Sequence, residues 1–356
     1  MDVEGIKTYL KNYAGPRIRI MEVCGSHTAA IEKNGIRGLL SDQISLISGP
    51  GCPVCVTPSA YIDHLLELAE DPKTCIVTFG DLIRVPGSQK SLGMARAEGA
   101  RVEMVYSPMD MLALAEREPE TRFVFAAIGF ETTTPVYALL VQQILEKGIR
   151  NVRLLTSLKR MPPVIRYLCD HDAPVEGFLA PGHVCVVTGS RAFEPLAESY
   201  GIPFGVSGFE PEEILLALYG IVKVWEESLR RGEAGKAFRG RVMNFYPSVV
   251  SEEGNVTAQK LVDTYFMSAD ACWRGMGVIE DSGLLLREEY AWLDAGSAGL
   301  VEDKKKNTAC RCDEVLMGKR QPRECPLFGK VCTPLTPQGA CMVSTEGSCF
   351  SFFANR

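Results

Sequence analysis

Thiols are the side chains of this sequence whose spacing most clearly suggests chemistry. The chain has 356 residues and 13 cysteines, and the segment Gly49–Cys55 reads Gly-Pro-Gly-Cys-Pro-Val-Cys. A Cys-x-x-Cys pair can close a disulfide, bind a soft metal, or serve no chemical purpose. Zinc needs four ligands, and the sequence offers no second Cys-x-x-Cys. Because Pro58 also suits a helix start nearby, we favour a reversible dithiol at Cys52 and Cys55.

The C-terminal segment is the most cysteine-rich part of the chain. Its prolines and glycines leave little apolar core, so it needs a covalent or metal staple. Thiolates suit an iron–sulfur cluster or zinc. Six cysteines exceed one four-ligand site by two, which leaves a spare pair able to pass electrons between a cluster and a dithiol. The six are Cys310, Cys312, Cys325, Cys332, Cys341 and Cys349.

Four loops that follow predicted strands carry polar or thiol groups. They are Cys24–His27, Gly49–Cys55, Gly129–Pro135 and Pro181–His183. Loops at the carboxyl ends of parallel strands are where open α/β sheets bind their ligands. If the two halves of the chain present these ends to each other, the four loops line one cleft.

The first of these loops contains Cys24 and His27. Cys24 is either a buried cysteine that packs like a small hydrophobe or a reactive thiol. Gly25 would let a ligand approach closely. His27 either lowers the pKa of a nearby thiol or is a helix-start residue. We favour the functional interpretation of Cys24.

Glu131 and His183 are candidate polar residues of the later loops. Glu131 either belongs to a surface N-cap arrangement with the neighbouring threonines or acts on a ligand in the cleft. His183 follows a Pro-Gly turn, where a neutral imidazole can hydrogen-bond a ligand. We expect His64 and His171 at the surface. The cysteines expected to serve in packing are Cys75, Cys169, Cys185 and Cys272.

Composition is that of a globular protein, with 46% hydrophobic and 23% charged residues. The net charge of −6 argues against nucleic acid or an anionic membrane as the main partner. No apolar run approaches the roughly 20 residues of a membrane span, and the N-terminus does not resemble a signal peptide. We therefore expect a cytoplasmic protein, where structural disulfides are uncommon. No glycine-rich phosphate-binding motif follows a predicted strand.

Short apolar runs alternate with amphipathic segments, which predicts an α/β fold. The length exceeds that of one hydrophobic core, so several domains are expected. We predict two similar three-layer α/β domains, with mainly parallel sheets that face a cleft, and a helical, cysteine-rich iron–sulfur domain. The domains are residues 15–118, residues 119–209, and residues 1–14 with 210–356. Helices are expected over Val256–Met267 and Glu288–Asp294.

Five motifs, in order, resemble those of the hydrogenase maturation factor HypD family. The first four are Cys-Gly-Ser-His-Thr from Cys24, Gly-Pro-Gly-Cys-Pro-Val-Cys from Gly49, Gly-Phe-Glu-Thr-Thr-Thr-Pro from Gly129, and Pro-Gly-His-Val from Pro181. The fifth is the tail, with Cys-Pro-Leu-Phe-Gly-Lys-Val-Cys from residue 325 and Gly-Ala-Cys-Met-Val-Ser-Thr-Glu-Gly-Ser-Cys ending at residue 349. The motifs span nearly the whole chain.

The resemblance implies a cytosolic assembly factor for the Fe(CN)2CO centre of nickel–iron hydrogenases. It implies two similar α/β domains and a third domain that holds a [4Fe-4S] cluster. In this family the iron is held jointly with a small HypC-type partner, and a HypE-type partner delivers cyanide, with HypF-type carbamoyl supply upstream. Such a protein is a maturation scaffold with redox activity rather than a conventional turnover enzyme.

The resemblance also assigns roles to individual residues. Cys24 becomes the iron-holding thiol, and Cys52 and Cys55 become a nearby dithiol. Cys325 and Cys332 become cluster ligands. The remaining two come from Cys310 or Cys312 and from Cys341 or Cys349, of which we select Cys310 and Cys349, leaving Cys312 and Cys341 as spare thiols. The polar residues of the cleft become His27, Glu131 and His183.

Two other functions fit parts of the sequence. A cluster-linked dithiol/disulfide oxidoreductase acting on a protein substrate explains Cys52, Cys55 and the tail, but leaves Cys24 and its Gly-Ser-His continuation unexplained. A zinc-stapled binding module explains only the tail.

Overall fold

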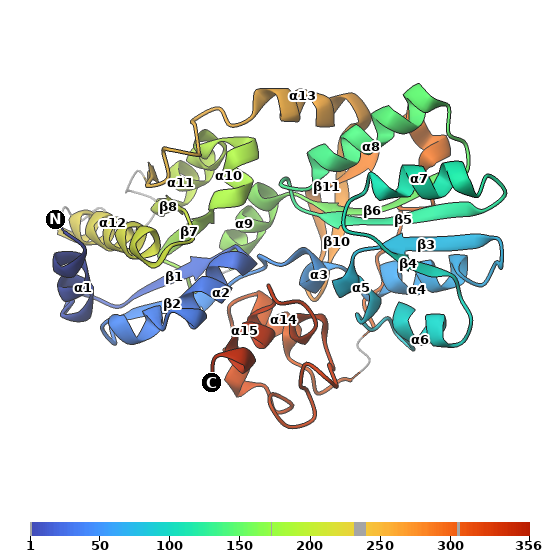
Figure 1. Ribbon diagram of the computed structural model, residues 1–356. Helices are drawn as coiled ribbons and strands as arrows, with labels where there is room; N and C mark the ends of the chain where they lie inside the picture. Colours follow the sequence, from blue (N-terminus) through green and yellow to red (C-terminus); the bar gives the residue numbers. More distant parts are fainter. Residues whose placement is uncertain (1, 172, 231–239, 305–306) are drawn as a thin grey trace.

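Two mainly parallel β-sheets lie side by side, and the C-terminal segment packs where they meet (Figure 1). The computed structural model describes residues 2–171, 173–230, 240–304 and 307–356. Within these ranges, no helix combines the length and apolar character needed to cross a membrane.

The first sheet has five parallel strands in the order β2-β1-β7-β8-β9. Helices α1 (Val3–Lys11), α2 (Gly25–Lys33) and α12 (Pro211–Arg230) pack over one face through a shared apolar cluster. Helices α10 (Gly182–Thr188) and α11 (Glu194–Tyr200) lie on the other face. The strands are β1 (Ile18–Glu22), β2 (Ile44–Ser48), β7 (Gly177–Pro181), β8 (Phe204–Ser207) and β9 (Val242–Asn244).

Among the described residues, the second sheet has six strands in the order β10-β11-β6-β5-β3-β4. Strand β11 is antiparallel to both β10 and β6, and the other neighbouring strands are parallel. Its central strand β5 is buried after its first residue, as its apolar sequence Phe-Val-Phe-Ala-Ala-Ile requires. The strands are β3 (Thr74–Thr78), β4 (Val102–Met104), β5 (Arg122–Gly129), β6 (Val152–Lys159), β10 (Phe266–Trp273) and β11 (Gly277–Leu286).

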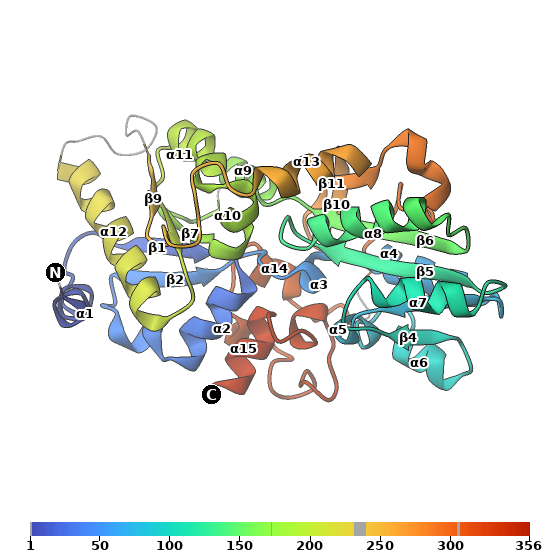
Figure 2. The same ribbon diagram turned by 45° about the horizontal axis from the view of Figure 1, so that its top comes forward.

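Helices also cover both faces of the second sheet. One face packs against α7, α8 and α13, and the other against α4, α6 and α9. Helix α13 runs along the side of the molecule away from the tail and connects β9 of one sheet to β10 of the other (Figures 1 and 2). These helices are α4 (Ser59–Leu68), α6 (Leu92–Ala97), α7 (Asp110–Arg117), α8 (Thr134–Lys147), α9 (Met161–Asp170) and α13 (Val256–Tyr265).

One apolar core joins both sheets and the tail. It contains Phe178 from the first sheet, Val124 from the second, and Met342 from the tail. The short tail elements include α14 (Cys312–Leu316) and α15 (Ser348–Ala354). Helix α15 lies against α2 (Figure 2), and the 3-10 helix Ala340–Met342 lies against α3 (Pro53–Val56). The tail therefore shares the hydrophobic core of the two sheets and is not a separately packed appendage.

The predicted fold class is confirmed, because helices cover two mainly parallel sheets and a cysteine-rich region adjoins them. The sheets do not follow the predicted segments 15–118 and 119–209, however. Each sheet takes strands from both segments, since β1 and β2 pair with β7 while β3 and β4 pair with β5. The predicted boundary after residue 118 falls in the turn between α7 and β5, within one sheet and the helices that cover it.

The region after residue 210 is less helical than predicted. The predicted helix Val256–Met267 ends at Tyr265, where β10 begins, and β11 follows as its hairpin partner. This hairpin escaped prediction because small and polar residues such as Ser268 and Asp270 interrupt its apolar pattern at the sheet edge. Residues 288–293 form a 3-10 helix rather than an α-helix.

Candidate functional site

A cavity of about 510 Å³ lies at the carboxyl ends of strands from both sheets. Loops after β1, β2, β5 and β7 all contribute to its wall, as expected for open parallel sheets. From the four predicted loops it takes Cys24, Ser26, Gly51, Pro53, Val54, Gly129, Phe130, Thr132, Thr133, Pro181 and His183. The prediction that these loops line one cavity is therefore met by the geometry.

Cys24 lies at the wall of this cavity as the N-cap residue of α2, with 8% of its surface exposed. Burial raises the pKa of its thiol to about 11, although the backbone N–H groups of His27 and Ser26 act in the opposite direction. The start of a helix favours a negative charge. Cys24 is therefore a protonated thiol at neutral pH, in a position that can accommodate the thiolate once a cation replaces the proton.

The Cys24 loop and the Cys-x-x-Cys loop are held together by their backbones. The Gly25 N–H donates to the Gly51 carbonyl at 2.9 Å. A side chain at Gly51 would collide with the backbone of Cys24, so only glycine fits this approach. The Gly-Pro-Gly sequence therefore brings the two thiol-bearing loops into contact.

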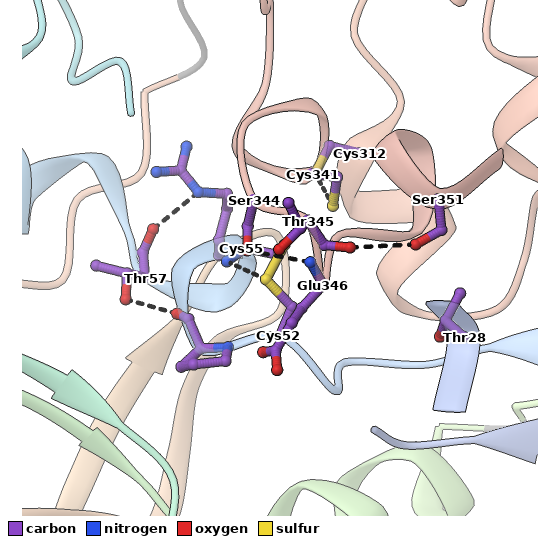
Figure 3. Close-up of a disulfide and its surroundings, with 12 residues drawn as sticks. Thr28, Cys52, Cys55, Thr57, Cys312, Cys341, Ser344, Thr345, Glu346 and Ser351 are labelled. Carbon is purple, nitrogen blue, oxygen red and sulfur yellow. Dashed lines mark hydrogen bonds between the residues drawn. A yellow bond between two sulfur atoms is a disulfide. The ribbon is translucent and has the colours of Figure 1, made fainter. Parts of the chain in front are cut away.

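Cys52 and Cys55 form a disulfide directly behind the cavity wall (Figure 3). Cys52 caps α3 and its sulfur accepts the Cys55 N–H at 3.2 Å. Both sulfurs are buried, whereas Gly51, Pro53 and Val54 face the cavity. Tail residues Ser344–Glu346 lie beside the disulfide (Figure 3) and also line the cavity.

The two histidines predicted for the cleft occupy different environments. His183 lines the cavity, whereas His27 is fully buried and absent from its wall. His27 Nε2 donates to the Gly208 carbonyl at 2.9 Å, and burial lowers its pKa to about 4. Both imidazoles contact the ring of Phe209. His27 is thus placed to support the wall rather than to touch a ligand.

Glu131 lies outside the Cys24 cavity. It lines a separate cavity of about 500 Å³, and its Oε1 accepts the Met161 N–H at the start of α9 at 2.8 Å. Its Oε2 is buried and has no hydrogen-bond partner among the described residues. Burial raises the pKa of the carboxyl to about 7. Of the two predicted roles of Glu131, its contacts match helix capping. The helix that it caps is α9, and not the helix that follows its own threonines.

Sequence reasoning missed the acidic residues of the cavity. Glu346 of the tail and Asp81, in α5 (Gly80–Ile83), both line it. The Ser26 hydroxyl donates to Glu346 Oε1 at 3.2 Å, and burial raises the pKa of Glu346. Glu346 lies between Cys341 and Cys349 in the sequence. Its place within the cysteine-rich segment was the one sequence feature that could have indicated a role for it.

All six tail cysteines surround one space of about 10 Å³. The sulfurs of Cys312 and Cys341 are hydrogen-bonded at 2.8 Å, and Cys341 also interacts with Cys349. Gly339 packs against Cys310 and Cys312, where a side chain would not fit beside the Cys310 sulfur. The Gln338 N–H donates to the Cys332 sulfur at 3.4 Å.

The donor set of the tail suits an iron–sulfur cluster, which takes four thiolates and backbone N–H bonds to sulfur. Six thiols line the shared space, two more than such a cluster takes, and Cys341 interacts with Cys349 as well as with Cys312. No group of three or more His, Cys, Asp or Glu side chains in the described part of the chain is arranged to hold a single metal ion. The six sulfurs share one space without converging on one point.

The fold and the site define a cysteine-based metal or redox protein, with one thiol in a cavity between two sheets and six more in a packed tail. The family model described as "HypD: Hydrogenase formation hypA family" matches residues 3–356.

Curated relatives agree with this match. The hydrogenase maturation factor HypD of Escherichia coli is 41% identical over 98% of this chain and 92% of its own length. The proteins of the same name from Rhodobacter capsulatus and Azotobacter vinelandii are 41% and 40% identical, each over 94% of this chain and 89% of their length. The chain belongs to the HypD family, which confirms the resemblance seen in its motifs.

Proposed function

We propose that the protein is an assembly scaffold for the Fe(CN)2CO centre of [NiFe] hydrogenases. The observation that carries the proposal is the position of Cys24, a buried thiol at a helix start on the wall of a cavity. The proposal fits a hydrogenase maturation factor acting in the cytoplasm, where a reducing environment keeps such thiols available.

Iron is the cargo, and Cys24 is its ligand. A thiol with a pKa of about 11 loses its proton when a metal binds, and the N–H groups of His27 and Ser26 then stabilise the thiolate. A soft thiolate suits a low-spin iron. A HypC-type partner contributes a second cysteine, so that the iron is held between the two proteins.

The cavity wall suits cyanide and carbon monoxide as the other iron ligands. Val54, Ile128 and Phe130 give apolar surface for carbon monoxide, which needs no hydrogen bond. Thr132 and His183 line the same wall, and within the described residues neither side chain makes a hydrogen bond. They are free to donate to a cyanide nitrogen.

The Cys52–Cys55 pair supplies the electrons that release cyanide from a HypE-type donor. A thiocyanate on the donor plus two thiols gives the donor thiol, hydrogen cyanide and the Cys52–Cys55 disulfide. The S–C bond breaks, the S–S bond forms, and two electrons and two protons pass to the products. The pair lies directly behind the cavity wall, which keeps this exchange next to Cys24.

The tail would hold a [4Fe-4S] cluster through Cys310, Cys325, Cys332 and Cys349. When bound, such a cluster supplies single electrons for thiol chemistry. Cys312 and Cys341 stay outside that ligand set, and the 3-10 helix Ala340–Met342, which contains Cys341, contacts α3. The protein is then a scaffold with redox activity rather than a conventional enzyme.

The test is anaerobic co-purification with the HypC-type partner, followed by infrared spectroscopy and iron analysis. Wild-type protein should show cyanide and carbonyl stretching bands, and Cys24→Ala should lose both bands and the iron. Cys75→Ala is the matched control, because Cys75 is equally buried but packs in the core of the second sheet. Retention of the bands in Cys24→Ala would contradict the proposal.

The disulfide itself favours one other function, a cluster-linked oxidoreductase acting on a protein disulfide. The same infrared measurement separates the two functions. A disulfide reductase shows no cyanide or carbonyl bands, and its activity requires Cys52 and Cys55 but not Cys24.

A further inference from the structure

A second cavity, of about 360 Å³, shares no lining residue with the Cys24 cavity. It lies where β6 meets the β10–β11 hairpin, and Lys159, Ser157, Cys272 and Tyr61 are among its lining residues. None of the residues assigned to iron or cluster chemistry lines it. We call it the Lys159 site.

Lys159 is the last residue of β6 and only 3% exposed. Its ammonium lies 5.9 Å from the centre of the Trp273 ring. Among the described residues it has neither a hydrogen bond nor an ion pair. Burial lowers its pKa to about 8, which still leaves most of the side chain charged at neutral pH. A buried cation of this kind is costly without a counter-ion.

The neighbouring acidic groups do not supply that counter-ion. The Cys272 thiol donates to the Val301 carbonyl at 3.2 Å, and burial raises its pKa although the charge of Lys159 acts in the opposite direction. Asp270 lies at the rim, exposed to solvent, and its carboxylate accepts the Asp281 N–H. A bound ligand could therefore supply the negative charge that neutralises the Lys159 ammonium.

Ser157 provides a second donor on the same face of β6. Residues two apart on a strand point to the same side, roughly 6.6 Å apart. Ser157 is 7% exposed, and its hydroxyl makes no hydrogen bond within the described residues. The ammonium and the hydroxyl thus offer two neighbouring donors to one ligand.

We propose that the Lys159 site binds a small organic carboxylate, whose oxygens accept hydrogen bonds from the Lys159 ammonium and the Ser157 hydroxyl. One positive charge matches one carboxylate, and two donors match its two oxygens. The remaining wall is largely apolar, with Leu284, Leu300 and Val301, which suits a short hydrocarbon body. Inorganic phosphate, with up to two charges and no apolar part, matches this wall less well.

The experiment is isothermal titration calorimetry of the full chain with butyrate and, separately, with inorganic phosphate. Butyrate should bind the wild type, and Lys159→Met should weaken its binding by about 10- to 100-fold, the value of a hydrogen bond to a charged group. Lys147→Met is the control, because Lys147 is exposed and paired with Glu116, and it should bind butyrate as the wild type does.

Lys159→Met should fold, because it replaces an uncompensated charge by an apolar chain of similar length. If it does not fold, Ser157→Ala should still weaken butyrate binding by about 5-fold, the value of a neutral hydrogen bond. Absence of butyrate binding to the wild type, equal binding by Lys159→Met, or binding of phosphate in place of butyrate would each overturn the proposal. None of these readouts depends on hydrogenase maturation.

Discussion

The two thiol-bearing regions of the molecule differ most in the space around their sulfurs. Cys24 faces a cavity of about 510 Å³, whereas the six tail cysteines close around about 10 Å³. A wide cavity admits and releases a cargo with its ligands. A tight group of thiols suits a group that stays with the protein and contributes to its stability. Under the proposed function, a cysteine sulfur is thus a temporary ligand of the cargo in one region, and cysteine sulfurs hold a permanent cluster that stabilises the fold in the other.

The largest expected effect comes from removing one tail thiol. Cys332→Ser should abolish the visible absorption and acid-labile sulfide of anaerobically purified protein. It should also lower the free energy of unfolding by more than about 3 kcal/mol, because the tail loses its staple. Cys24→Ala should keep both the absorption and the stability. Equal loss of stability in the two variants would remove the distinction between cargo thiol and structural thiols.

The contact between the two loops at the cavity is the next test. Gly51→Ala places a methyl group against the backbone of Cys24 and should cost about 1–3 kcal/mol of unfolding free energy. It should also weaken the iron-linked infrared bands, because it moves Cys24 relative to its helix. Gly38→Ala, which has open space around it, is the control and should change neither quantity.

Glu131 tests which residues belong to the cavity. Its pKa is raised to about 7 in the folded protein, so between its unfolded value near 4.5 and pH 7 the folded state binds the extra proton. Stability contributed by this proton is therefore lost as pH rises through 7, by about 2–3 kcal/mol. Glu131→Gln should remove this slope in urea titrations at pH 5 and 8. It should leave the infrared bands unchanged. Loss of the bands in Glu131→Gln would show that Glu131 does act at the Cys24 cavity.

The smallest effect concerns the reactivity of Cys24. A pKa of about 11 leaves roughly one thiolate in 10,000 molecules at pH 7, so alkylation by iodoacetamide should be slow. The rate measured by mass spectrometry should rise about tenfold per pH unit between pH 7 and 9. A rate that stays flat over this range would show that access, not ionisation, limits the reaction.

The elements of the fold were largely predictable, because β5 and β6 are apolar runs and α12 has a clear amphipathic period. The strand order was not. Placing β7 beside β1 depends on packing between segments more than 150 residues apart, which local patterns do not encode. The division into two consecutive α/β segments failed to match the sheets for the same reason.

The site was predictable where glycine and thiol motifs mark it. Cys24, the Cys52–Cys55 loop and His183 lie where strand-end loops place them. Glu131 shares a turn with Thr132 and Thr133 but lines the other cavity, because its carboxylate accepts the Met161 N–H at the start of α9. Glu346 was missed because its neighbours in space, Ser26 and Asp81, lie far from it in the sequence.

The chain passes from the first sheet to the second after β2, returns after β6, and passes again after β9. A cut between any two strands of the described chain therefore divides at least one of the sheets between the two fragments. Residues 1–118 alone would carry two strands of each sheet with open edges, a condition that favours aggregation. Both complete sheets and the complete cavity wall therefore need residues from across the chain, including Glu346 of the tail.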